Sequence, residues 1–165
     1  GGGDNNEEFD YRVTFSAVVS SVLEGGLACA DAEPLPLLTG TGTIVSVSGT
    51  VSAVTSTDSC CGAEVLACVG GPVSSKDVTY LAALTSGTRV QITRNGTSFD
   101  GAVYASTACM GSPNSIQNSC VAGADGSNAT DGFVFTPTAT GDYFVFVDGV
   151  ANSGGAFTLD LRLLP

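Results

Sequence analysis

Six cysteines are the residues whose chemistry the sequence defines best. The chain contains no histidine, and no two of its cysteines are spaced as a CxxC pair. Common zinc and haem sites use histidine or paired CxxC motifs, so neither group is expected here. Disulfides are the remaining use of cysteine, and they persist in oxidising compartments. We therefore expect an exported protein with disulfides among Cys29, Cys60, Cys61, Cys68, Cys109 and Cys120.

Nucleophilic catalysis lacks a general base in this sequence. Without histidine, a serine or threonine would depend on a lysine for activation, and Lys76 is the only lysine. It follows two serines and belongs to no further catalytic motif. Most aspartates stand next to glycine in turn dipeptides, where their carboxyl groups cap the backbone rather than pair as in a glycosidase. We therefore expect no enzyme activity.

Calcium is the one metal that the acidic loops could bind, because it prefers oxygen ligands. Asp100, Asp125 and Asp131 stand at the ends of expected strands and are the candidate ligands, although no EF-hand spacing accompanies them. No other cofactor is expected. The net charge is −11 and no basic patch is present, so we expect no binding to nucleic acid. No apolar run approaches the roughly 18 residues of a membrane span.

Strands are the elements that must position these residues. Val, Thr, Ser and Gly dominate the sequence, while strong helix formers are scarce. Residues 43–55 alternate between apolar and polar and are interpreted as one long strand or a hairpin about Gly49. Further strands are expected near 78–84, 90–94, 102–104, 133–135, 143–147 and 157–163, separated by turn dipeptides. This pattern predicts an all-β fold, an antiparallel β-sandwich or jelly roll.

A set of motifs follows in order between about residues 27 and 163. It consists of Cys29-Ala30-Asp31-Ala32, Lys76-Asp77-Val78-Thr79-Tyr80, Ser86-Gly87-Thr88-Arg89-Val90, Thr140-Gly141-Asp142-Tyr143, Val147-Asp148-Gly149 and Gly155-Ala156-Phe157-Thr158-Leu159. In this order the motifs resemble the bacterial pre-peptidase C-terminal domain family, small β-sandwiches appended to secreted proteases and surface proteins. The resemblance implies a non-enzymatic sandwich over residues 25–165, with calcium bound in some members. The chain departs from the family after Cys120, where many relatives carry an acidic cluster.

The resemblance also supports one disulfide, Cys109–Cys120, which closes a short loop. Three pairings remain open for the other four cysteines. We favour Cys29 bonded to one of the vicinal residues Cys60 and Cys61, with the other bonded to Cys68. The alternative joins Cys29 to Cys68 and leaves a strained vicinal bridge.

Residues 1–24 lie outside the resemblance and form a predicted N-terminal extension. From residue 9 to 20 apolar and polar side chains alternate, as in a strand with one buried face. This strand belongs either to the chain's own sandwich or, as a donor strand, to the sheet of a neighbouring subunit. In the second case the side chains at the subunit interface are Phe9, Tyr11, Val13, Phe15, Ala17 and Val19.

Two hypotheses of function follow. The first is a structural subunit of an extracellular bacterial filament or surface assembly, a homopolymer joined by donation of the N-terminal strand. The alternative is a secreted accessory module that binds calcium, a polysaccharide or a protein. Both place the protein outside the cell or on its surface.

Overall fold

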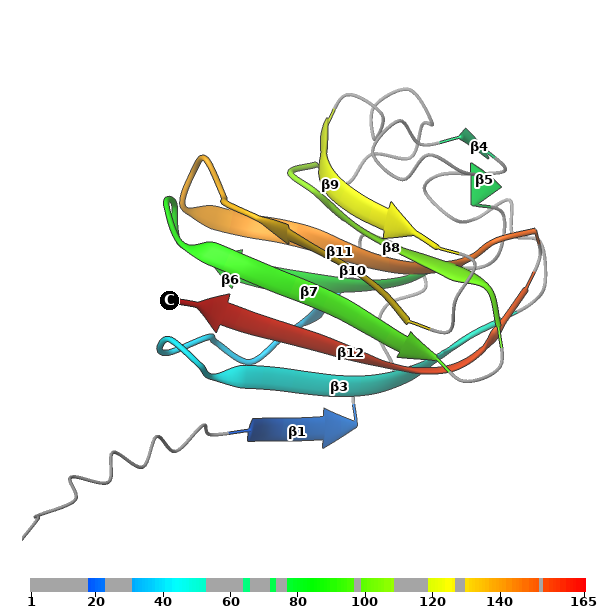
Figure 1. Ribbon diagram of the computed structural model, residues 1–165, viewed down its shortest axis with the longest axis horizontal. Helices are drawn as coiled ribbons and strands as arrows, with labels where there is room; N and C mark the ends of the chain where they lie inside the picture. The colour runs from blue at the N-terminus through cyan, green and yellow to red at the C-terminus, as the bar shows by residue number, and fades with distance from the viewer. Residues whose placement is uncertain are drawn as a thin grey trace, which may run out of the picture.

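Two five-stranded β-sheets packed face to face form the computed structural model of this chain (Figure 1). The structure describes residues 18–22, 31–52, 64–65, 72–73, 77–96, 99–108, 119–126, 130–151 and 153–165. None of these residues belongs to a helix long and apolar enough to cross a membrane. The expected all-β sandwich is thus confirmed.

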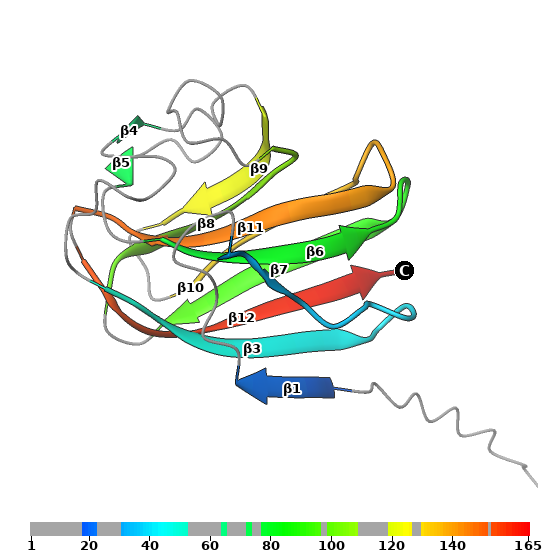
Figure 2. The ribbon, with the colours of Figure 1, turned by 180° about the vertical axis from the view of Figure 1, so that it is seen from behind.

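The strands of the two sheets alternate along the chain. Sheet A contains, in spatial order, β1 (Val18–Val22), β3 (Ile44–Val51), β12 (Gly155–Leu164), β7 (Arg89–Gly96) and β10 (Thr130–Phe135). Sheet B contains β2 (Glu33–Pro34), β6 (Val78–Leu84), β11 (Gly141–Gly149), β8 (Gly101–Ser106) and β9 (Cys120–Asp125). A separate pair of short strands consists of β4 (Glu64–Val65) and β5 (Pro72–Val73). Figure 2 shows the same two layers from behind.

The core lies between the sheets because every second residue of the central strands is apolar. The inward side chains of β3, β7 and β12 are almost completely buried, as are those of β6, β8 and β11 on the facing sheet. Each fully buried aliphatic or aromatic side chain contributes roughly 1.5–3 kcal/mol of transfer free energy. The alternation in the sequence therefore decides which face of each strand packs inward.

Gly49 lies within β3, which continues without a break from Ile44 to Val51. The long-strand interpretation of this segment is confirmed, and the hairpin about Gly49 is wrong. The missing side chain leaves room for two aromatic rings, because a Cβ here would lie 2.6 Å from Phe157 Cζ and 2.8 Å from Tyr80 Oη. These rings meet edge to face, with centroids 6.4 Å apart.

Two connections cross from one sheet to the other at the same end of the sandwich. One joins β6 to β7 through Gly87, which adopts the left-handed conformation with φ of 80°. The other joins β10 to β11. The two connections bind each other, since Gly87 N donates to Pro137 O at 3.0 Å and Ser86 N donates to Thr140 Oγ1 at 3.0 Å. Consecutive strands here therefore face each other across the core rather than pairing as hairpins.

Two strand pairs are parallel, whereas the sandwich was expected to be antiparallel throughout. β1 pairs with β3 and β2 pairs with β6, at an edge of sheet A and of sheet B respectively. A parallel pair requires a long connection rather than a tight turn. The residues between β1 and β3 provide that length. The remaining neighbours in both sheets are antiparallel.

The end of the predicted donor strand belongs to the chain's own sheet A. In β1, Val18 pairs with Ile44 and Val19 pairs with Val45. Val19 is therefore placed within the same chain. The other expected interface residues lie outside the described part of the chain, and their role stays a prediction: Phe9, Tyr11, Val13, Phe15 and Ala17.

Cys120 begins β9 and is disulfide-bonded. Its partner lies outside the described residues, so the pairing Cys109–Cys120 stays a prediction. The same holds for the pairing among the remaining cysteines, none of which is described: Cys29, Cys60, Cys61 and Cys68.

Candidate binding face

The outer face of sheet B is closed to solvent over its central strands. Thr79, Tyr104 and Phe146 point away from the core cluster, yet each has a relative exposure of 0%. The two rings are stacked, with centroids 4.9 Å apart and planes at 14°. A partner could not reach these side chains without displacing other parts of the chain.

The outer face of sheet A is open and polar. We define the polar face as the outward side chains of its four central and edge strands β3, β12, β7 and β10. It carries Ser46, Ser48, Thr50, Thr158, Asp160, Arg162, Gln91, Thr93, Asn95, Thr130 and Val134, all exposed or half-buried. Val134 is the large apolar residue among them, with 47% exposure.

A hydrogen-bonded ladder crosses the polar face at right angles to the strands. Ser46 Oγ donates to Asp160 Oδ1 at 2.6 Å, and Asn95 Nδ2 donates to Asp160 Oδ2 at 3.1 Å. Thr130 Oγ1 in turn donates to Asn95 Oδ1 at 3.2 Å. One side chain from each of four adjacent strands is thereby held in place. Side chains ordered in advance lose less entropy when they bind a partner.

Two arginines stand at the end of this face where β12 finishes. Arg162 lies opposite Gln91 in the register, and Arg89 lies opposite Leu164. The two arginines are therefore diagonal neighbours on one surface, with backbones about 7–8 Å apart. Both are exposed, in contrast to Arg94, which is completely buried.

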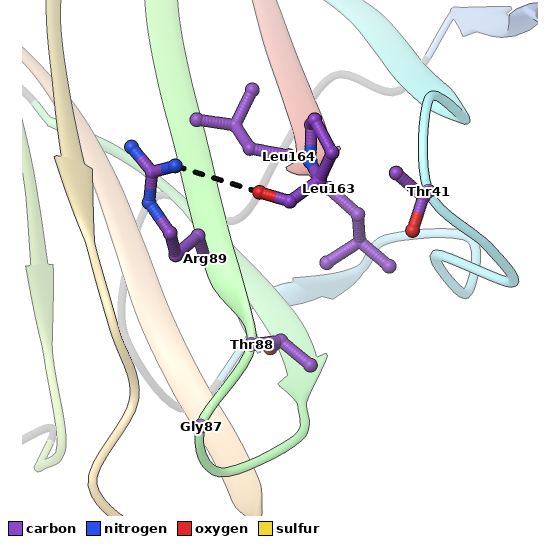
Figure 3. Close-up of a pocket in the computed structure, with 7 residues that line it drawn as sticks. Thr41, Gly87, Thr88, Arg89, Leu163 and Leu164 are labelled. Carbon is purple, nitrogen blue, oxygen red and sulfur yellow. Dashed lines mark hydrogen bonds between the residues drawn. The ribbon is translucent and has the colours of Figure 1, made fainter.

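A small pocket adjoins this arginine pair at the end of the sandwich (Figure 3). It has a volume of about 210 Å³. Its lining comes from the turns before β3 and β7 and from the end of β12: Thr41, Gly87, Thr88, Arg89, Leu163, Leu164 and Pro165. Arg89 Nη1 donates to Pro165 O at 3.4 Å across it.

The opposite end of the sandwich holds a buried ion pair. Arg94 of β7 and Asp131 of β10 form a salt bridge, with side chains only 0% and 1% exposed. Arg94 Nε also donates to Asp131 Oδ2 at 3.0 Å. The second carboxylate oxygen of Asp131 accepts from Gly126 N at 2.8 Å. The ion pair thus joins both sheets at their β9–β10 edge.

The guanidinium of Arg94 fits because two neighbouring glycines leave room for it. A Cβ at Gly96 would lie 2.6 Å from Arg94 Nη1, and one at Gly101 would lie 3.1 Å from Arg94 Cζ. Phe99 covers the guanidinium, with 4.8 Å from Arg94 Cζ to the ring centroid, within range of a cation–π interaction.

The structure brings the three candidate calcium ligands to this same end. Asp131 is the ion-pair partner of Arg94, and Asp100 and Asp125 lie near enough to interact electrostatically. Within the described residues, no group of three or more acidic or cysteine side chains is arranged to hold a metal ion. The cation beside Asp131 is Arg94, and calcium binding at these aspartates stays a prediction.

Asp125 titrates under the influence of its neighbours. Burial raises the pKa of its carboxyl group, repulsion from Asp100 and Asp131 raises it further, and Arg94 lowers it. A raised pKa in the native state means that the folded protein binds this proton more tightly than the unfolded chain does. Stability therefore decreases as the pH rises through the pKa of Asp125 in the folded protein.

We expect Asp125→Asn to remove this loss. Relative to the wild type, the free energy of unfolding of the variant should increase between mildly acidic and neutral pH, because only the wild type acquires the repelled charge. Urea unfolding at a series of pH values measures the difference. Asp142→Asn, an exposed position at the far end of β11, controls for net charge. A gain at neutral pH no larger than at low pH would contradict the expectation.

The sequence analysis missed Arg94 and the pairing partners of Asp131. The signal was present, because Arg94 follows Val90 and Ile92 at every second position and therefore had to point inward. A charged residue at an inward position requires a buried counter-ion. The polar face had no such signal, since serine and threonine are frequent throughout the chain.

No protein-family model matches the sequence, and no curated protein matches it at the level of sequence. Among the solved structures that resemble it is Aeromonas hydrophila PliG, a periplasmic lysozyme inhibitor of g-type lysozyme. Its TM-score is 0.52 at 12% identity, over 90% of this chain and 99% of that one. The pre-peptidase C-terminal domain of a collagenase from Bacillus anthracis gives 0.46 at 10% identity, over 92% and 100% of the two chains. The family resemblance seen in the motifs thus has structural similarity beside it, without a match in sequence.

Proposed function

We propose that this chain is an exported, non-catalytic binding module that recognises a protein partner through the polar face of sheet A. The observation that carries the proposal is the ladder Ser46–Asp160–Asn95–Thr130, which orders polar side chains on four adjacent strands. A rigid sheet with preorganised donors and acceptors suits recognition of another surface. The closed outer face of sheet B leaves sheet A as the open one.

A protein fits this face better than a polysaccharide. Sugar rings are commonly held by stacking on exposed aromatic side chains, and the polar face contains no aromatic residue. The described tyrosines are all buried: Tyr80, Tyr104 and Tyr143. Hydrogen-bonding groups with an exposed valine and arginine beside them are typical of protein interfaces, where arginine is enriched.

The fold and the cysteine chemistry support the proposal further. The same fold serves a periplasmic lysozyme inhibitor, a protein that acts by binding another protein. Export is consistent with the disulfide at Cys120, because disulfides persist in oxidising compartments. The absence of histidine from the whole sequence removes the commonest general base.

Site-specific photo-crosslinking in the exported compartment of the source organism tests the proposal. A photoreactive amino acid is placed at Thr50 or Val134, both exposed on the polar face, and in a separate variant at Ala83, exposed on the outer side of sheet B. We expect a discrete crosslinked protein from each polar-face position and none from Ala83. No product at any position, or equal products at all three, would contradict the proposal.

A substitution gives the matching affinity measurement once the crosslinked partner is purified. Asp160→Ala removes the acceptor shared by Ser46 and Asn95 and should weaken binding by roughly tenfold, the equivalent of one charged hydrogen bond. Asp142→Ala removes the same charge away from the face and should leave the affinity unchanged.

Assembly into a homopolymer remains a second hypothesis, now confined to residues 9–17. Residues 18–22 are engaged with β3 of the same chain.

A further inference from the structure

The pocket beside Arg89 combines one positive charge with an apolar wall. Leu163 and Leu164 provide the wall at the end of β12, while Thr41 and Thr88 enclose the pocket from the neighbouring turns (Figure 3). No acidic side chain lines it. In a chain with a net charge of −11, this corner therefore carries a local positive charge that nothing in the lining neutralises.

Arg89 presents its guanidinium to an oxygen at this position. Its hydrogen bond to Pro165 O measures 3.4 Å, longer than the usual 2.7–3.2 Å range and therefore weak. Within the described part of the chain, no other hydrogen bond or ion pair of Arg89 is found. A carboxylate accepts two parallel hydrogen bonds from a guanidinium, so it would bind more strongly than the single oxygen of Pro165.

The size of the pocket limits what could accompany the carboxylate. Sites for drug-sized ligands measure roughly 300–1,000 Å³, whereas this one measures about 210 Å³. The space suits one small branched side chain packed on the two leucines. Thr88 Oγ1 is already committed, since it donates to Thr85 O at 2.6 Å, so the guanidinium is the main polar anchor.

We propose that this pocket binds a carboxylate carried on a small apolar group, with Arg89 holding the carboxylate and Leu163 and Leu164 packing on the apolar part. The same chemistry occurs in a free branched amino-acid derivative and at the C-terminus of a peptide that ends in leucine. The site is separate from the protein contact proposed above, because it requires only one corner of sheet A.

Titration of the purified full-length protein by NMR tests the pocket with defined probes. N-acetyl-leucine should shift the backbone amide signals of Thr88, Arg89 and Leu164 and should bind with a dissociation constant of about 1 mM, as expected of a small ligand. N-acetyl-leucinamide has the same shape without the charge and should bind roughly tenfold more weakly. Equal binding of the two probes, shifts confined to other residues, or no binding of N-acetyl-leucine would overturn the proposal.

Two arginine variants separate a specific contact from general charge. Arg89→Gln should weaken binding of N-acetyl-leucine by roughly tenfold, whereas Arg162→Gln removes the same charge nearby and should change it by less than about twofold. Equal losses in both variants would reduce the site to a general attraction and overturn it. Arg89 is exposed, so its replacement should not affect folding.

A third probe identifies the source of the ligand. The peptide acetyl-Gly-Gly-Leu with a free carboxylate should bind more tightly than N-acetyl-leucine if the natural ligand is the end of a protein chain. Equal or weaker binding of the peptide assigns the pocket to a free acid. Either result is independent of the crosslinking experiment, because the titration uses the isolated protein.

Discussion

Asp131→Asn should destabilise the protein more than any other single substitution of a charged residue in the described part of the chain. The replacement keeps the shape of the side chain and removes its charge, which leaves the guanidinium of Arg94 buried without a counter-ion. Breaking a buried ion pair from one side typically costs about 3–5 kcal/mol. Since domains of this size have a free energy of unfolding of roughly 5–15 kcal/mol, the loss is a large part of the total. Urea unfolding monitored by circular dichroism measures it.

Two further variants make this expectation specific. Asp142→Asn removes the same charge from an exposed position and should change the free energy of unfolding by less than about 0.5 kcal/mol. The double variant Arg94→Met with Asp131→Leu leaves neither charge buried and should be more stable than Asp131→Asn alone. If Asp131→Asn lost no more stability than Asp142→Asn, the ion pair would have no structural role.

Gly49→Ala should lower the free energy of unfolding by roughly 1–3 kcal/mol, the usual cost of overpacking a core. The new methyl group would meet the ring of Phe157 at 2.6 Å and the hydroxyl of Tyr80 at 2.8 Å. Both rings are buried between the sheets, so neither can move aside without disturbing its neighbours. Thermal or urea unfolding shows the loss directly.

Gly40→Ala is the matched control. A Cβ at Gly40 has Thr43 Oγ1 as its nearest neighbour at 3.9 Å, an ordinary contact, so this variant should be close to neutral. Phe157→Leu removes the ring edge that Gly49→Ala strikes. The double variant should therefore be more stable than the sum of the two single changes indicates. Strict additivity would show that the clash with Phe157 is not the cause.

Strand positions and their inward faces could be read from the sequence, because a side-chain period of two reflects a local property of the backbone. The six strands expected near residues 78–163 are found as β6, β7, β8, β10, β11 and β12. β9 was not expected. Its sequence Val121-Ala122-Gly123-Ala124 has small residues at successive positions and no clear alternation.

Pairing could not be read in the same way, because it depends on which strands meet across long stretches of chain. The turn at Ser86-Gly87 has the composition of a hairpin, yet it sends β6 and β7 to different sheets. Burial of both apolar faces against each other outweighs the local preference for a hairpin. The choice of β3 as the partner of β1 is equally a matter of tertiary structure.

The candidate site shows the same division between local and tertiary information. Composition alone determined that the chain has no histidine for catalysis and cysteines suited to disulfides. The tertiary structure decided that Ser46, Asp160, Asn95 and Thr130 form one ladder, although they lie as much as 114 residues apart in the chain. It also decided that Asp131 pairs with Arg94. The physical reason is that residue types depend on the sequence, whereas side-chain neighbours across a sandwich depend on strand order and register, which form only when the two sheets bury their apolar faces together.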